Sequence, residues 1–199
     1  IFQGKRVDFK DARDALDMGI SMIHQELSPI PEMTVAENVF LGRENKKIKG
    51  LPFVDVKELN KKTEKILEEY GLEELIKPNM KMKHLNIAQV QMMEIIKAVS
   101  YDSKVIIMDE PTSSLSETET EILFRIIDNL KAKNVGIVYI SHRMDEVFQL
   151  ADRVSVLRDG SFIGCVRVSE ASPEELINMM VGRELEGGYP VNDTPKGKV

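Results

Sequence analysis

The 199-residue chain contains a single cysteine, and this scarcity excludes an internal disulfide framework. A lone Cys165 is typical of a protein from a reducing compartment. No apolar run approaches the roughly 18 residues that a membrane-spanning helix requires. The chain has 27 Lys and Arg residues and 33 Asp and Glu residues, which gives a net charge of −6. With no basic or aromatic binding stretch either, we expect no nucleic-acid partner.

The sequence also lacks a phosphate-binding loop of the form G-x-x-x-x-G-K-[ST]. Gly4-Lys5 and Gly197-Lys198 have neither the required spacing nor the following hydroxyl residue. The cradle of backbone N–H groups and the lysine that hold β- and γ-phosphates in such loops are therefore not found in these residues.

Hydrophobic and charged residues make up 42% and 30% of the chain, which is ordinary for a globular protein. The length fits one domain, or one domain with a small subdomain. Short apolar runs predict strands at residues 20–23, 105–108, 137–140 and 154–157, and the last is expected to form a hairpin with 162–168. Residues 2–9 alternate loosely and are expected to form a strand or hairpin arm. The pattern indicates an α/β fold.

Helix-capping residues mark the starts of the predicted helices. Thr34 with Glu37 and Asn86 with Gln89 have the spacing of a capping box, in which each side chain satisfies a free N–H group of the other residue. Helices are predicted to start at residues 11, 34, 55, 86, 116, 144 and 172. Residues 34–100 are thus mostly helical and read as an insertion between two strand-bearing regions. Residues 45–52 read as a loop, and 187–199 as a linker.

Two adjacent carboxylates, Asp109 and Glu110, follow the apolar run Val105–Met108, and Pro111 then stops the strand. A continuous apolar run suits a parallel strand buried on both faces. Ligands of open α/β sheets gather at the carboxyl ends of the strands. There, one acid could hold Mg²⁺ and the other could orient or deprotonate water. Taken alone, the pattern fits a strand that ends in a polar turn equally well.

Other polar residues near predicted element ends each allow a simple structural interpretation as well. Gln25 could reach a metal or a water, or could be an ordinary surface residue. The helix that starts at Asn86 could offer its N-terminus to a phosphate, but a well-capped amphipathic helix explains it more simply. His142 follows a strand, where a histidine is more often a capping or packing residue than a catalytic one.

The ordered set of motifs is more specific than any one of them. The motifs are MIHQEL at 22–27, QMMEI at 91–95, IMDEPTSSL at 107–115, GIVYISH at 136–142 and MVGR at 180–183. Together they resemble the ATP-binding domain of ABC transporters, over nearly the whole chain. The resemblance is strongest to the first of two tandem ATPase domains in bacterial sugar importers of the ribose and galactose/methyl galactoside kind.

The resemblance implies a P-loop NTPase-like fold with a mainly parallel sheet, an inserted helical subdomain and a missing phosphate-loop part. It divides the chain into a remnant of the ATPase core at 1–33, a helical subdomain at 34–100, the rest of the core at 101–186 and a linker at 187–199. The missing phosphate loop is expected upstream of Ile1 in the intact protein. We therefore expect the chain as given to bind ATP poorly and not to hydrolyse it.

The resemblance also assigns roles to individual residues. Gln25 matches the Q-loop glutamine, which touches Mg²⁺ and the attacking water. Asp109 matches the Walker B aspartate that holds Mg²⁺, and Glu110 matches the catalytic base. His142 matches the switch histidine that contacts the γ-phosphate. These roles suit phosphoryl transfer, which depends mainly on positioning and on neutralising charge.

Two further matches concern nucleotide bound between domains. Asn86, Ile87, Ala88 and Gln89 match the signature motif, which covers the γ-phosphate of ATP bound to the opposing domain. Ser114 lies in the stretch that matches the D-loop. The signature carries Asn86 where the family has serine. An amide therefore replaces a hydroxyl near the phosphate, and we expect reduced activity at one composite site.

The implied cofactors are ATP and Mg²⁺. The implied partners are the membrane permease subunits, a second ATPase domain in tandem or as a dimer, and, indirectly, a periplasmic or extracellular sugar-binding protein. The permease is expected to dock on the helical insertion near residues 27–34, which places the protein at the cytoplasmic face of the membrane. Two alternatives stay open: a non-catalytic module that keeps the fold, and a soluble ABC-type ATPase that acts on nucleic acid or ribosomes.

Overall fold

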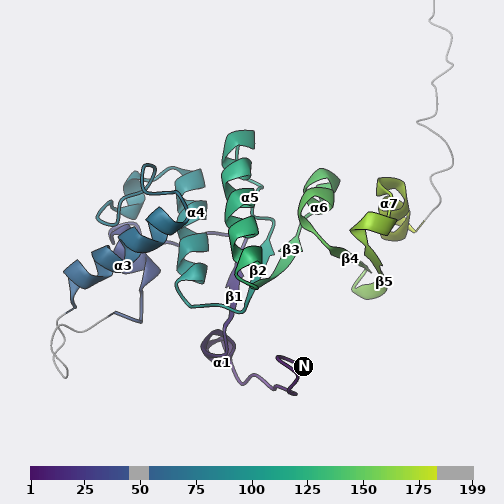
Figure 1. Ribbon diagram of the computed structural model, residues 1–199, viewed down its shortest axis with the longest axis horizontal. Coiled ribbons are helices and arrows are strands. Elements are labelled where there is room, and N and C mark those ends of the chain that lie inside the picture. Colours follow the sequence, from purple (N-terminus) through teal and green to yellow (C-terminus); the bar gives the residue numbers. More distant parts are fainter. Residues whose placement is uncertain (45–53, 183–199) are drawn as a thin grey trace, which may run out of the picture. The chain divides into compact units, whose positions relative to one another are not determined.

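The computed structural model describes residues 1–44 and 54–182 (Figure 1). The described residues divide into two compact units, one up to His142 and one from Arg143 onward. The division after His142 differs from the predicted boundaries at 33, 100 and 186, which concern functional subdomains and stay predictions. The predicted linker at 187–199 and the predicted loop at 45–52 lie outside the described residues.

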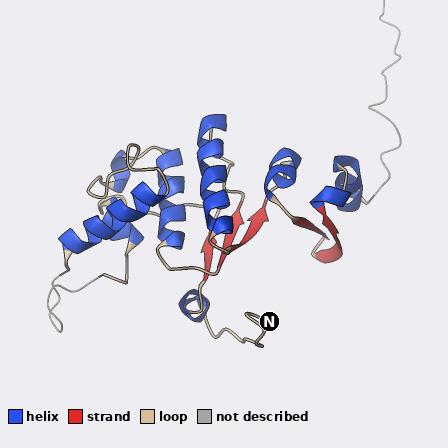
Figure 2. Cartoon of the chain, viewed as in Figure 1, coloured by secondary structure: helices blue, strands red, loops and turns tan. Residues whose placement is uncertain are grey.

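The first unit is built around a three-stranded sheet of order β1-β2-β3, with β1 at Ile20–Ile23, β2 at Val105–Asp109 and β3 at Gly136–Ile140. Both pairings are parallel, so the three strands point the same way (Figure 2). Their positions confirm the three predicted strands. The connection from β1 to β2 contains the predicted helical insertion, and the connection from β2 to β3 contains α5 (Glu117–Ala132).

Side chains alternate between the two faces of this sheet, and one face is closed. Ser21, Ile23, Ile106 and Met108 point to that face and are buried. The helix α4 (Ile87–Val99) contacts β1, and α5 contacts β3. Apolar residues of the two helices supply the core on this side, namely Met92, Met93, Ile95 and Ile96 from α4 and Leu123, Ile126 and Ile127 from α5.

The insertion between β1 and β2 contains α2 (Val35–Val39), α3 (Val56–Glu69), the short 3₁₀ helix η1 (Met82–His84) and α4. The capping boxes predicted at Thr34 and Asn86 are both present. Asp55 caps α3 as predicted, because its side chain accepts a hydrogen bond from the N–H of Glu58. The mainly helical character of this stretch is thereby confirmed for its described residues.

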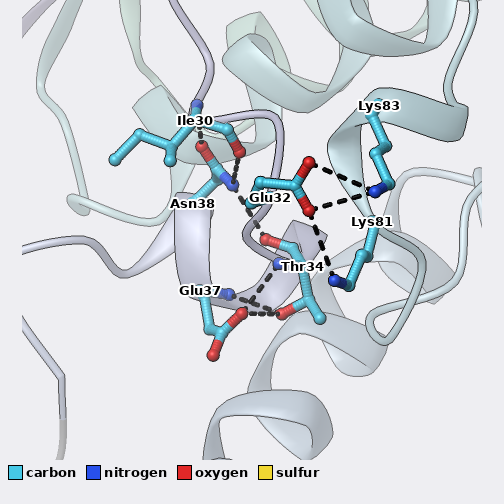
Figure 3. A network of polar contacts seen from close by, with 7 residues as sticks. All are labelled: Ile30, Glu32, Thr34, Glu37, Asn38, Lys81 and Lys83. Atoms are coloured by element: carbon cyan, nitrogen blue, oxygen red, sulfur yellow. Dashed lines mark hydrogen bonds and ion pairs between the residues drawn. The ribbon is translucent and has the colours of Figure 1, made fainter.

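The buried side chain of Asn38 fixes the entry into α2 (Figure 3). Its Oδ1 accepts from the N–H of Ile30 at 2.8 Å. Its Nδ2 donates to the carbonyl oxygens of Ile30 at 3.2 Å and Thr34 at 3.0 Å. One amide thus bonds to three backbone groups. These bonds fix the end of the segment between β1 and α2 against the helix.

An exposed ion cluster of Glu32, Lys81 and Lys83 also holds the segment between β1 and α2. The carboxylate of Glu32 binds the ammonium of Lys83 at 3.0 Å and that of Lys81 at 3.5 Å (Figure 3). Hydrogen bonding from Lys83, with a smaller contribution from Lys81, lowers the pKa of Glu32. Because all three side chains are substantially exposed, the cluster adds little to stability compared with the buried Asn38 contacts.

The second unit contains α6 (Met144–Leu150), the antiparallel hairpin of β4 (Arg153–Arg158) and β5 (Ser161–Arg167), η2 (Val168–Glu170) and α7 (Pro173–Val181). Asp159 and Gly160 both have positive φ in the hairpin turn, at 50° and 76°. This is the backbone of a two-residue turn that matches strand twist. The predicted hairpin and both predicted helices are confirmed.

The N-terminal segment differs from its prediction. Residues 2–9 do not form a strand. Phe2 and Lys5 exchange two backbone hydrogen bonds around a tight turn, in which Gln3 and Gly4 have positive φ. The chain then continues without strand pairing to α1 (Ala12–Asp17), where Asp11 is the cap. A short hairpin is marginal by itself, and no described strand lies along this one.

Among residues 1–44 and 54–182, no helix combines the length and apolar character needed to span a bilayer.

Candidate functional site

The candidate site lies at the carboxyl edge of the β1-β2-β3 sheet. Gln25 follows the last residue of β1 by two positions, and His142 follows the last residue of β3 by two positions. Asp109 ends β2, and Glu110 comes directly after it. Because parallel strands end at the same edge, three separate parts of the chain deliver polar side chains to one place.

Glu110 is the centre of this group. Gln25 Nε2 donates to Glu110 Oε2 at 3.1 Å, across 85 residues of sequence. His142 Nδ1 lies 2.9 Å from Glu110 Oε1, across 32 residues. Each carboxylate oxygen of Glu110 therefore has its own partner, one from the segment after β1 and one from the segment after β3. The structure brings these three predicted site residues into direct contact.

The backbone of Glu110 is unusual in a way that aims its side chain. Its φ is +43°, a value that residues other than glycine rarely adopt. Its N–H donates to the carbonyl oxygen of Ile140 at 2.9 Å and extends the pairing with β3. Its own carbonyl oxygen then accepts from the N–H of Ser113 at 3.2 Å. Such strain persists only where surrounding contacts enforce it, and it concentrates at functional sites.

The site is open to solvent. The side chain of His142 is 70% exposed and that of Glu110 is 29% exposed. A ligand can thus reach the free edge of the imidazole, while Glu110 is partly sheltered. Charge on His142 would strengthen its contact with the Glu110 carboxylate, because the two groups would then form an ion pair.

Asp109 is half-buried and pairs with Ile140 in the sheet register. Within the described part of the chain, no three His, Cys, Asp or Glu side chains group as a protein-only metal site would require. Mg²⁺ is usually held by one or two carboxylates together with phosphate oxygens and water. The adjacent Asp109 and Glu110 fit that kind of donor set.

The predicted signature residues lie at the start of α4. Asn86 Oδ1 accepts from the N–H of Gln89 at 2.8 Å, and Gln89 Oε1 accepts from the N–H of Asn86 at 3.0 Å. Gln89 Nε2 also donates to the carbonyl oxygen of Leu75 at 2.8 Å. Ile87 is 64% exposed, whereas Ala88 is buried. These contacts do not involve the Gln25, Glu110 and His142 group.

Ser114, the other predicted nucleotide contact, is exposed in the turn that follows Glu110. Thr112 is 3% exposed in the same turn, and its carbonyl oxygen accepts from the N–H of Leu115 at 3.1 Å. The turn therefore has a buried anchor and an exposed tip. Ser114 makes no contact with the Glu110 group among the described residues, so its predicted role is not addressed by this geometry.

Sequence reasoning missed one buried polar contact behind the site. Ser103 Oγ lies 2.9 Å from Ser21 Oγ and 3.0 Å from the carbonyl oxygen of Ala98. Both serines are buried, so this contact joins β1, the end of α4 and the start of β2. No signal in the sequence links two serines that stand 82 positions apart.

Comparison with known families identifies one match. The profile described as "ABC transporter" matches residues 1–113.

Two curated relatives carry the same name, galactose/methyl galactoside import ATP-binding protein MglA. The protein from Haemophilus influenzae strain Rd is 47% identical over 96% of this chain and 37% of its own length. The protein from Clostridium tetani is 48% identical over 100% of this chain and 39% of its own length. The chain thus spans less than two fifths of the relatives it matches.

Solved structures give a consistent result. A nucleotide-free ATP-binding cassette from an ABC transporter matches with a TM-score of 0.67 and 28% identity, over 85% of this chain and 68% of that one. The ADP conformation of an ATP-binding cassette matches with a TM-score of 0.65 and 29% identity, over 85% and 67% of the two chains.

Proposed function

The chain belongs to the ABC transporter family, and we propose that it forms part of the ATP-hydrolysing subunit of a sugar importer. The observation that carries the proposal is the contact of Gln25 and His142 with the two oxygens of Glu110, at the carboxyl edge of a parallel sheet. Membership of the family implies that the intact protein binds a nucleotide, and ATP with Mg²⁺ is the pair that this edge suits.

Asp109 is the residue proposed to bind Mg²⁺, directly or through water, since it ends β2 beside the other acidic residue. Gln25 would contribute its amide oxygen to the same ion. In the nucleotide-free geometry, its Nε2 points to Glu110, which leaves the amide oxygen available. Bound Mg²⁺ would neutralise charge on the β- and γ-phosphates. The protein's own part is to hold these two side chains at one edge.

Glu110 is the residue proposed to polarise the attacking water. To accept a proton or a hydrogen bond from that water, one carboxylate oxygen must exchange its present partner for the water. Gln25 is the partner that can leave, because it lies on an exposed segment that follows β1. His142 would stay on the other oxygen through Nδ1–H with its Nε2 edge toward the γ-phosphate, to which Nε2 donates only in the doubly protonated imidazolium.

The start of α4 is proposed to act on a second nucleotide, bound to an opposing ATPase domain. The capping box occupies Asn86 Oδ1 and Gln89 Oε1, so the Asn86 amide nitrogen and the first free N–H groups of the helix are available as donors. Exposure of Ile87 keeps this end of the helix accessible, while the buried Ala88 anchors it. Ser114 would approach the same shared interface from its exposed turn.

The cargo is proposed to be a monosaccharide, galactose or methyl galactoside in the first place and ribose in the second. The support is the name that the two relatives share, galactose/methyl galactoside import ATP-binding protein. The proposed partners are the membrane permease subunits, a second ATPase domain and, indirectly, an external sugar-binding protein. Such a subunit would work at the cytoplasmic face of the membrane.

The test of this proposal is ATP hydrolysis by the full-length protein assembled with its permease. Glu110→Gln keeps the size of the side chain and one acceptor oxygen, but it replaces the other oxygen with an NH2 donor and removes the basicity. We expect turnover to fall by at least about 100-fold, the usual contribution of a general base, while nucleotide binding persists.

Glu117→Gln is the matched control, because Glu117 is an exposed acid in the first turn of α5. It should leave turnover within about twofold. Equal turnover in the Glu110→Gln variant and the wild type would refute the proposed role of Glu110. Absence of ATP hydrolysis in the wild-type assembly would refute the function itself.

A further inference from the structure

The side chain of Arg43 joins the C-terminal ends of two helices. Its Nη2 donates to the carbonyl oxygen of Val39, the last residue of α2, at 2.9 Å. Its Nη1 donates to the carbonyl oxygen of Ser100, which caps α4, at 2.9 Å, and Nη2 also donates to Ser100 Oγ at 2.7 Å. Carbonyl oxygens at the end of a helix have no partner within the helix. One guanidinium therefore supplies donors to two helix ends that are 57 residues apart in sequence.

Two aromatic rings hold the guanidinium of Arg43 in this place. Its central carbon lies 3.4 Å from the ring centre of Tyr101 and 5.4 Å from that of Phe40. Tyr101 follows the cap of α4 and Phe40 caps α2, so the rings come from the same two helix ends. The N–H of Arg43 donates back to the carbonyl oxygen of Phe40 at 2.8 Å, after a turn at Gly42 with a φ of +75°. This combination suits arginine, because the compact ammonium of lysine cannot reproduce planar stacking with several directed bonds.

The contacts of Arg43 complete a closed series of elements. The segment that carries Gln25 leads from β1 to α2, where the Asn38 amide holds it (Figure 3). Arg43 joins the end of α2 to the end of α4. The buried hydroxyl of Ser103 then joins the end of α4 back to β1. The C-terminal end of α4 is therefore held on two sides, and Arg43 supplies the polar contact with α2.

The length of α4 makes this anchor important for the opposite end of the helix. The helix has 13 residues, so it is about 20 Å long at a rise of about 1.5 Å per residue. A change in tilt of about 5° at the anchored end would move the N-terminus by about 1.7 Å. A misplacement of about 1 Å by a distant mutation can lower a reaction rate about 100-fold. A fixed tilt of α4 is thus a condition for any catalytic contribution from its N-terminus.

We propose that Arg43 is a positioning residue that fixes the tilt of α4 relative to α2 and thereby places Asn86 and the free N–H groups at the start of α4. The inference rests on the proposed function, in which this helix start acts on a nucleotide bound to an opposing ATPase domain. Arg43 acts at the far end of α4. It therefore controls the rate of ATP hydrolysis and leaves nucleotide binding at the chain's own Asp109 and Glu110 edge unchanged.

The first test compares kinetic and binding constants of the full-length protein assembled with its permease. Arg43→Met keeps the apolar stem of the side chain and removes the guanidinium. We expect kcat of ATP hydrolysis to fall about 10- to 100-fold. The Kd of Mg²⁺-ADP and the number of ADP sites per protein, both from calorimetry, should change by less than about twofold. ADP is the probe because it lacks the γ-phosphate that the start of α4 would meet. A merely structural role would lower the number of ADP sites together with kcat.

Lys97→Met is the matched control, because Lys97 is a cation in the last turn of α4 and its ion pair is with Glu94 of the same helix. It should leave kcat within about twofold. Arg43→Lys keeps a charge and a donor, so it should restore part of kcat. Ser100→Ala removes the hydroxyl partner of Arg43 and should lower kcat about threefold, the effect of one hydrogen bond. Ser100→Ala decides the outcome if Arg43→Met yields no folded protein.

The tilt of α4 is measured independently of hydrolysis, by pulsed electron paramagnetic resonance. Spin labels are attached after Ile87→Cys, at the start of α4, and Asn129→Cys, on α5, in a full-length protein without its other cysteines. We expect Arg43→Met to shift or broaden the distribution of distances between the labels by at least about 1.5 Å. Lys97→Met should leave the distribution unchanged.

Three results would overturn the inference while the proposed function stands. The first is an unchanged distance distribution in Arg43→Met. The second is a kcat of Arg43→Met within about twofold of the wild type. The third is a kcat that falls only in proportion to the number of ADP sites, together with wild-type turnover in Ser100→Ala. Absence of hydrolysis in the wild-type assembly would instead refute the proposed function, and the distance distribution alone then decides whether Arg43 fixes α4.

Discussion

Replacement of Asn38 by alanine tests how the segment between β1 and α2 is held. Asn38 is 2% exposed, and its amide makes three hydrogen bonds with backbone groups of Ile30 and Thr34. No other residue can take over these bonds without moving the backbone, because the groups are arranged around this one amide (Figure 3). Alanine leaves the Ile30 N–H without its partner, whereas the carbonyl oxygens of Ile30 and Thr34 each lose one hydrogen bond and keep one from a backbone N–H.

The expected loss of stability follows from these contacts. A typical hydrogen bond contributes about 0.5–1.5 kcal/mol, and a buried group left without its partner costs about 1–3 kcal/mol. Ile30 itself is 38% exposed, so water can reach part of the vacated site. We therefore expect Asn38→Ala to lower the free energy of unfolding by about 2–3 kcal/mol, below the sum of three fully buried losses.

The assay is urea denaturation of the 199-residue chain, followed by circular dichroism. Asn129→Ala is the matched control, because Asn129 is exposed on α5 and should change the free energy by less than about 0.5 kcal/mol. Asn38→Asp keeps the acceptor for the N–H of Ile30 but loses both donors, so it should destabilise at least as much as alanine. An Asn38→Ala variant as stable as the Asn129→Ala control would refute the reasoning.

Three further predictions concern nucleotide binding and the single thiol. The 199-residue chain should show no micromolar affinity for ATP in calorimetry, since it lacks a phosphate-binding loop; a micromolar constant would contradict this. Asn86→Ser should keep the α4 cap and raise ATP turnover of the full-length assembly. Unchanged turnover would show that the Asn86 amide does not reduce ATP hydrolysis. Hydrogen bonds from Ser155, and then from Arg153, lower the pKa of Cys165. Alkylation of Cys165 should therefore reach its half-maximal rate at a lower pH in the folded chain than in urea. Ser155→Ala should make the pH difference between the folded and unfolded chains smaller. Identical pH profiles of alkylation in the folded and unfolded chains would contradict the hydrogen bond from Ser155 to Cys165.

Much of the fold could be predicted because local patterns and tertiary demands agree. The apolar run before Asp109 is too short for a helix, and it predicts a parallel strand buried on both faces. The parallel strand is confirmed, but only Ile106 and Met108, on one face, are buried. The capping boxes at Thr34 and Asn86 fix helix starts within a few residues of sequence. The likeness to solved ATP-binding cassettes confirms the predicted P-loop NTPase-like α/β fold, and the family match confirms the recognised family.

The meeting of Gln25, Glu110 and His142 was predictable for a topological reason. Each residue follows the carboxyl end of a predicted strand, and parallel strands end at one edge. The positive φ of Glu110 was not predictable, because nothing in a strand followed by Glu-Pro requires a left-handed residue. It accompanies a hydrogen bond from the Glu110 N–H to the Ile140 carbonyl oxygen, a partner distant in sequence.

The predictions failed where a segment depends on partners distant in sequence. Residues 2–9 have strand-like alternation, yet no described strand accepts their hydrogen bonds, and only the turn around Gly4 forms. No sequence pattern indicates the three backbone contacts of Asn38, and only the folded chain shows them. The exposed second face of the sheet was likewise invisible in a sequence that is apolar on both sides of β2.

The central claim is that the carboxyl edge of this sheet binds a metal-bound nucleotide, and Mn²⁺ binding by electron paramagnetic resonance tests it most directly. The full-length protein is titrated with Mn²⁺ in the presence of a non-hydrolysable ATP analogue. Asp109→Asn should weaken Mn²⁺ binding by about 10–100-fold, the usual effect of removing a residue that supports a metal site. Asp128→Asn, which changes an exposed acid on α5, should leave the affinity within about twofold. Equal Mn²⁺ affinity in the Asp109→Asn and Asp128→Asn variants would contradict the account.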